Sequence, residues 1–139
     1  MAMLQDLTSS INIVKITDPI DYNDGVPTSD YICMRNYDAV TICAYQGTEG
    51  AAVTVTITQC TQDADAGGDA KAFTTSKDIT VVANAITTVN IEGSDFDAEN
   101  NFDWIEFAIN DPGAAAVGCV FALCYRARYA EATMPSAIT

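Results

Sequence analysis

The chain has 139 residues, of which 49% are hydrophobic and 18% charged, and its 19 acidic and 6 basic residues give a formal net charge of −13. This length suits one domain, and the apolar content excludes an intrinsically disordered chain. The acidic excess argues against partners rich in phosphate, so we expect no nucleic acid and no membrane partner. The charge either keeps an apolar protein soluble or steers it toward another protein.

The N-terminal segment, MAMLQDLTSSINIVKITDP, has no basic stretch followed by an apolar run, so we expect no signal peptide. No part of the chain approaches the roughly 18 uninterrupted apolar residues of a membrane helix. The odd number of cysteines, lying in apolar runs, predicts buried reduced thiols and a cytoplasmic setting. These cysteines are Cys33, Cys43, Cys60, Cys119 and Cys124.

Short β-rich runs follow one another along the chain, separated by Gly, Asp, Asn and Pro. Residues 51–61 show the clearest period-two alternation, in which Val53, Val55 and Ile57 alternate with threonines, as in a half-buried strand. A polar loop at 46–50 predicts that this run forms a hairpin with the run before it. In chain order, we predict strands at 12–16, 31–35, 39–45, 51–61, 78–82, 87–92, 104–110 and 119–126.

The last predicted strand is apolar on both faces, because Phe121 and Leu123 alternate with Val120 and Ala122. Such a strand should lie centrally in its sheet. The one internal helix that the pattern allows is a single turn at 94–99, with Ser94 or Asp95 as its N-cap.

Many short strands without helical patterns between them predict an all-β, single-domain antiparallel β-sandwich of jelly-roll type over residues 1–139. Segments 1–10 and 127–139 lack strand periodicity. They are either extended arms that reach a neighbour or ends that fray.

The sequence contains no histidine, which removes the Ser-His and Cys-His pairs, histidine bases and the usual zinc sites. It also has no phosphate-binding glycine motif and no C-x-x-C pair. We therefore predict that the protein is not an enzyme, that it has no catalytic, cofactor-binding or metal-binding residues, and that it needs no cofactor.

Two acidic clusters are exceptions to consider. The loop from Asp63 to Asp69 loosely resembles a calcium loop, and the second cluster contains Asp95, Asp97, Glu99 and Asp103. Both are either solvated carboxylates or a hard-cation site, and neither supplies the ligand set of a known calcium loop.

A carbohydrate role also has a possible basis in the sequence. Asp103 and Glu106 are a potential glycosidase pair beside Trp104, but their spacing on a strand aims them in opposite directions. Trp104 itself is either a core residue or a sugar-stacking platform.

Apolar residues and arginines near the two ends of the chain form a candidate contact surface. Arginine and tyrosine favour interfaces, although the arginines could instead pair within the chain. The candidate contact residues are Leu4, Leu7, Arg126, Arg128, Tyr129, Met134, Pro135 and Ile138.

Four stretches together cover nearly the whole chain: LQDLTSSINIVKITDPIDYNDG, MRNYDAVTICAYQGTEGAAVTVTITQCTQDA, SDFDAENNFDWIEFAINDPG and YRARYAEATMPSAIT. In their order and coverage they resemble small virion proteins encoded beside the major capsid gene of tailed bacteriophages. That family is usually regarded as head decoration, or cement, proteins. The loop at 63–69 is more acidic than the family pattern.

The resemblance implies a β-sandwich that binds the outer surface of a phage head and stabilises the shell. Its implied partners are the major capsid protein and further copies of itself, as trimers or dimers. Its implied location is the virion surface, after assembly in the host cytoplasm. The alternatives are another phage structural part, such as a tail or connector component, and a carbohydrate-binding β-sandwich module.

Overall fold

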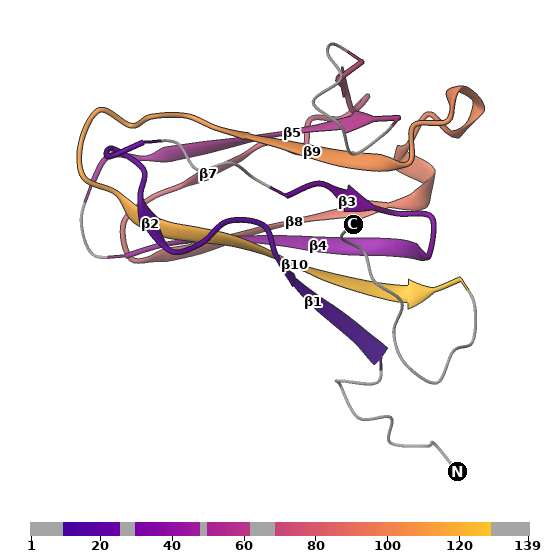
Figure 1. Ribbon diagram of the computed structural model, residues 1–139, viewed down its shortest axis with the longest axis horizontal. Coiled ribbons are helices and arrows are strands. Elements are labelled where there is room, and N and C mark those ends of the chain that lie inside the picture. Colours follow the sequence, from indigo (N-terminus) through magenta and orange to yellow (C-terminus); the bar gives the residue numbers. More distant parts are fainter. Residues whose placement is uncertain (1–9, 26–29, 48–49, 62–68, 129–139) are drawn as a thin grey trace.

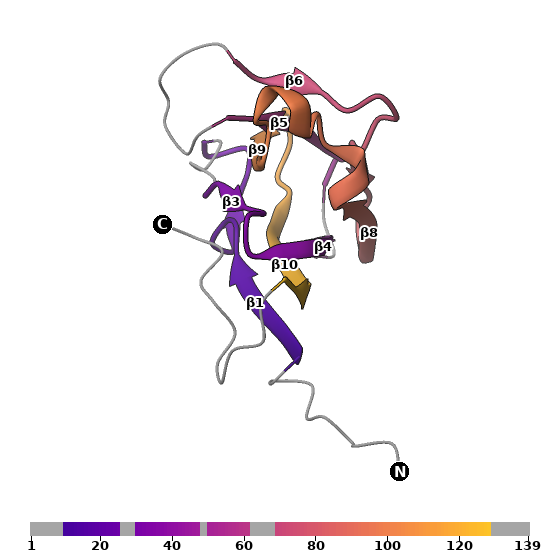
Figure 2. The same cartoon turned by 90° about the vertical axis from the view of Figure 1, so that its right-hand side faces the viewer.

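The computed structural model describes residues 10–25, 30–47, 50–61 and 69–128, which form two antiparallel sheets packed as two layers (Figures 1 and 2). We name each sheet after one of its central strands. The β4 sheet contains β1 (Ile11–Lys15), β2 (Ile20–Asp21), β4 (Tyr37–Gln46), β8 (Ala85–Glu92) and β10 (Val117–Ala127). The β5 sheet contains β3 (Ile32–Cys33), β5 (Val53–Cys60), β6 (Lys71–Ala72), β7 (Ile79–Val81) and β9 (Trp104–Ile109).

The order of strands identifies the architecture. The β4 sheet runs β1-β10-β4-β8, with β2 also on β10, and the β5 sheet runs β3-β9-β5-β6, with β7 also on β5. The chain changes sheets at β2–β3, β3–β4, β4–β5, β7–β8, β8–β9 and β9–β10. Two interleaved sheets connected in this way are a jelly roll. The predicted all-β, jelly-roll-like antiparallel sandwich is therefore confirmed.

The core lies between the two sheets and is built from the inward side chains of both. Ile42, Ile91 and Val120 from the β4 sheet meet Ile57 and Ile105 from the β5 sheet, and all five are almost completely buried. Burying a side chain of this size contributes about 1.5–3 kcal/mol. The alternation of the predicted strands thus marks one core-facing row in each.

All eight predicted strands exist, but the predicted hairpin is wrong. Instead of pairing with each other, β4 pairs with β10 and β8, and β5 pairs with β9, β6 and β7. The short link between them crosses from one sheet to the other, held by a bond from Gln46 Nε2 to the Ala51 carbonyl at 2.9 Å. Gly50 allows the crossing, because it has φ +118° and a Cβ there would lie 1.8 Å from the Ala115 carbonyl oxygen.

The predicted helical turn also needs correction. The β8–β9 connection contains two 3₁₀ turns, η1 (Gly93–Asp95) and η2 (Ala98–Asn100), whose N-caps are Glu92 and Asp97 rather than Ser94 or Asp95. Asp95 instead accepts a bond from the Glu92 amide at 2.8 Å. The connection between β8 and β9, residues 93–103, thus forms two separate 3₁₀ turns in place of one α-helical turn.

The structure also shifts the boundary of the predicted C-terminal arm. β10 extends to Ala127, and the Arg128 amide donates to the Asn36 carbonyl at 2.9 Å. Residue 127 therefore belongs to β10, and residue 128 is bonded to the turn that precedes β4. At the other end, Ile11 pairs with Tyr125, so the chain enters β1 beside the place where it leaves β10.

Candidate interaction surface

The side of the β4 sheet that faces away from the core is largely apolar. Cross-strand register places its outward residues in rows, such as Ile13–Leu123–Thr41–Asn90 and Cys119–Tyr45–Ile86. Four of them are widely exposed: Ile13 (63%), Ile86 (62%), Val117 (53%) and Tyr45 (43%). We call this surface the apolar face, and its apolar members are Ile11, Ile13, Ala39, Cys43, Tyr45, Ile86, Val117, Cys119, Phe121, Leu123 and Tyr125. Two of them, Ala39 and Cys43, are themselves buried.

The strand β10 explains why this face is apolar. It lies between β1 and β4, as the two-sided apolar pattern predicts, and its Val120 side faces the core. No second layer of described residues covers its Phe121 side, which stays half-buried between neighbouring strands. A contiguous exposed apolar surface on a folded domain commonly marks an interaction site.

The outer side of the β5 sheet is different. Apart from the buried Cys60 opposite Trp104, its outward positions on β5 and β7 are threonines, namely Thr54, Thr56, Thr58 and Thr80. Beside them on β9 lie Glu106, which accepts a bond from the Tyr31 hydroxyl at 3.2 Å, and the small Ala108. We call this surface the threonine face, and it can remain hydrated without cost.

Trp104 is not a sugar-stacking platform in this structure. Only 6% of it is exposed, and the Arg35 guanidinium lies 5.9 Å from the centre of its ring. Arg35 also pairs with Asp103, while Glu106 bonds to Tyr31. The two carboxylates considered for glycoside chemistry are therefore each held by a different partner.

Ion pairs gather where the β8–β9 connection closes one end of the sandwich. Lys77 Nζ lies 2.9 Å from Asp95 Oδ2, Lys71 pairs with Asp97, and Arg35 pairs with Asp103. Three carboxylates of the second acidic cluster are thus neutralised by cations of this chain. The two alternatives for this cluster were solvated carboxylates and a hard-cation site, and neither describes these three.

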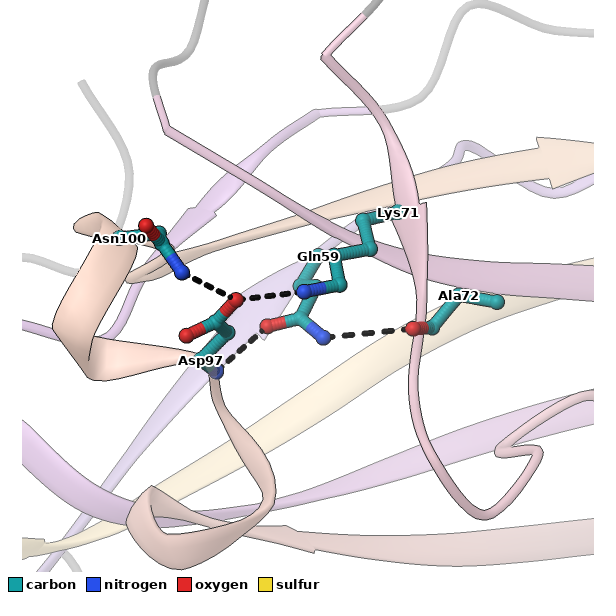
Figure 3. A network of polar contacts seen from close by, with 5 residues as sticks. All are labelled: Gln59, Lys71, Ala72, Asp97 and Asn100. Atoms are coloured by element: carbon teal, nitrogen blue, oxygen red, sulfur yellow. Dashed lines mark hydrogen bonds and ion pairs between the residues drawn. The ribbon is translucent and has the colours of Figure 1, made fainter.

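The network around Asp97 ties this connection to β5 and β6 (Figure 3). The buried Gln59 accepts a bond from the Asp97 amide at 2.8 Å and donates to the Ala72 carbonyl at 3.3 Å. Hydrogen bonds from Lys71 and from Asn100, the latter at 2.8 Å, hold the pKa of Asp97 below its usual value. Sequence analysis missed Lys71 and Gln59, because their partner lies 26 and 38 residues away.

Asp95 is ionised for a similar reason. Burial opposes its charged form, but bonds from the Glu92 amide and from Lys77 outweigh burial and lower the pKa of Asp95. Lys77 is itself largely covered and also donates to the Asn90 carbonyl at 3.2 Å. This pair therefore connects the segment before β7 to the end of β8.

Of the predicted contact residues, the structure places Arg126 and Arg128. Arg126 lies 3.5 Å from Glu92, and Arg128 Nε lies 3.0 Å from Asp38 and 3.3 Å from the Tyr37 carbonyl. Both arginines thus pair within the chain, but both pairs are exposed, and such pairs contribute little to stability. The remaining candidates lie outside the described residues: Leu4, Leu7, Tyr129, Met134, Pro135 and Ile138.

The five cysteines are all free thiols. Burial raises the pKa of Cys43 and of Cys119, and it raises that of Cys124 to about 12. A thiol with a raised pKa is a poor nucleophile and a poor metal ligand. Cys43, Cys60 and Cys124 are buried as predicted, whereas Cys33 and Cys119 are only partly buried, so the prediction of five buried thiols is wrong for these two.

The first acidic loop lies mostly outside the described residues, at 62–68. Its last member, Asp69, accepts a bond from the Thr61 amide at 3.1 Å. Within the described residues, no group of three or more carboxylates and thiols is arranged to hold a metal ion.

The described part of the chain also contains no helix that is long and apolar enough to cross a bilayer.

Comparison with known proteins shows no family for this chain. No family model matches the chain, and no curated protein matches it significantly. Among solved structures, the coat protein of Tobacco streak virus overlaps with a TM-score of 0.36 at 10% identity, covering 91% of this chain and 93% of that one. The structure of the coat protein dimer gives 0.35 at 9% identity and 94% of each chain. Overlaps this loose indicate no shared function.

Proposed function

We propose that this chain is a structural virion protein that decorates the outer surface of a tailed-phage head and stabilises the shell. The observation that carries the proposal is the exposed apolar face on a complete jelly-roll sandwich. A folded domain with this surface gains most by assembling with other proteins. The sequence resemblance to phage decoration proteins supplies the identity of the assembly.

The terminal segments supply the proposed contacts with the major capsid protein. They leave from adjacent strands at one corner, because Ile11 pairs with Tyr125. The apolar residues proposed to make these contacts belong to the segments before β1 and after β10: Leu4, Leu7, Tyr129, Met134, Pro135 and Ile138. Exposed arginines at this corner can exchange an internal carboxylate for one on the shell, which gives register more than affinity.

Several features weigh against the other functions. The sequence has no histidine, and Asp103 and Glu106 are each held by another residue of the chain, Arg35 and Tyr31 respectively. Both facts disfavour an enzyme. The buried Trp104 disfavours a carbohydrate-binding module. A tail or connector component remains the nearest alternative, because it would use the same kind of apolar surface.

Cosedimentation with empty capsids of the phage that encodes the chain tests this proposal. We expect the full chain to pellet with the shells and to raise their resistance to heat. Deletion of residues 1–9 or of 130–139 should leave the circular dichroism spectrum unchanged and weaken binding. A full chain that never pellets with its own capsids would rule out decoration, and tight binding by folded deletion variants would rule out the terminal contacts.

A further inference from the structure

The apolar face is almost free of negative charge in a chain whose net charge is −13. Among its described outward positions, the carboxylates lie at the margins of the sheet. Glu92 at one corner pairs with Arg126, and Asp21, opposite Val117 on the short strand β2, accepts bonds from the Asn23 and Ala116 amides. The one cation within the rows is Lys15, which pairs with Asp18. Two acidic molecules can therefore meet through this face while their carboxylates stay apart and hydrated.

The face is also large enough for a specific contact. Strands roughly 4.8 Å apart that rise roughly 3.3 Å per residue give the four-strand face an area of roughly 500 Å². Two such faces would bury roughly 1,000 Å² together, which is near the lower limit for a specific interface.

We propose that the apolar face packs against the same face of a second copy of this chain, sheet against sheet. A two-fold arrangement makes one surface complementary to itself, and stacked sheets lie roughly 10 Å apart, as in a sandwich core. Phe121 and Tyr45 would lie near the centre of the contact, with Ile13 and Ile86 from the outer strands β1 and β8. The inference deepens the self-association part of the proposed function and does not need the capsid.

Sedimentation velocity of the full chain without capsids tests the contact directly. We expect a concentration-dependent dimer for the wild type. Ile86→Lys and, separately, Ile13→Lys should weaken it by at least about tenfold, because each would bury an unpaired ammonium group. Thr56→Lys is the matched control, since it places the same charge on an exposed strand position of the threonine face. Circular dichroism melts show whether each variant folds.

Thiol labelling of the wild type gives a second measurement that needs no variant. Cys119 lies on the apolar face, whereas Cys33 lies on the outer side of the β5 sheet, and both are partly exposed. Labelling of Cys119, but not of Cys33, should slow as protein concentration rises. The proposal is overturned if the wild type stays monomeric, if Ile86→Lys and Ile13→Lys dimerise as well as Thr56→Lys, or if both thiols respond alike. Failure of capsid binding would leave all of these measurements unaffected.

Discussion

The two sheets of this sandwich share one core, but their outer surfaces differ in polarity. Ile13, Phe121 and Ile86 lie outward on the β4 sheet, whereas Thr56 and Thr80 hold corresponding positions on the β5 sheet. Both kinds of residue are favoured in strands, so strand formation does not explain the difference. Water does: threonine hydroxyls remain hydrated, while exposed isoleucines gain free energy when a partner covers them.

The largest expected effect is the difference in stability between substitutions on the two sides of a single strand. Ile91 on β8 is completely buried and Ile86 on the same strand is exposed. Ile91→Ala should lower the free energy of unfolding by about 2–5 kcal/mol, because it leaves a cavity in the core. Ile86→Ala should change it by less than about 0.5 kcal/mol in dilute, monomeric protein. Urea unfolding measures both, and equal losses would show that Ile86 is covered within the monomer.

The next effect compares polar groups on the two sheets. Gln59 is buried and bonds to the Asp97 amide, whereas Thr41 bonds to Asn90 at 2.7 Å on the outer side of the β4 sheet. Gln59→Leu should destabilise by about 1–3 kcal/mol, since the Asp97 amide loses its partner. Thr41→Val should cost less than about 0.5 kcal/mol, because water replaces an exposed bond. Thermal melts of the two variants test this contrast.

Acid should first weaken the contacts of Asp97 with Lys71 and of Asp95 with Lys77, which attach the β8–β9 connection to β6 and to the segment before β7. The pKa of Asp97 and of Asp95 is lowered in the folded state, so both bind protons more readily when unfolded. Their contribution is complete above the unfolded aspartate pKa of about 3.9 and is lost as pH falls through the lower folded values. Asp97→Asn should therefore flatten the fall of the urea midpoint between about pH 4 and pH 2.

The smallest effect concerns thiol reactivity. Denatured protein prepared without reductant should show all five cysteines free, and a count of one or three would reveal disulfides. In the native protein, Cys124 should react most slowly with a neutral alkylating reagent, because burial raises its pKa to about 12. Cys33 and Cys119, one on each outer side, should react before it. Peptide mass spectrometry after timed alkylation gives this order.

Addition of calcium tests the acidic loop that lies mostly outside the described residues. We expect melting temperatures with calcium and with chelator to differ little, since Asp69 is already bonded to Thr61. A rise of many degrees would demand a real site, because a ligand that binds only the folded state stabilises it.

Much of the fold could be read from alternation alone. Val53, Val55 and Ile57 have period two, so they share a face wherever their strand lies, and β10 was expected to be central because both of its faces are apolar. Period two does not say which strands become neighbours. The expected pairing of β4 with β5 failed for that reason: the chain crosses at Gly50 to the other sheet, where β9 lies 40 or more residues further along.

The candidate surface shows the same division. Sequence alternation already separated Phe121 and Leu123 from Val120 and Ala122, but it could not say which row faces the core. That depends on the second sheet, whose isoleucines cover one side of β10 and leave the other uncovered. The ion pairs of Lys71, Lys77 and Arg35 were equally hidden, because each joins residues 18 or more positions apart. Local chemistry determines strands and faces, whereas neighbours depend on contacts between distant segments that no short pattern records.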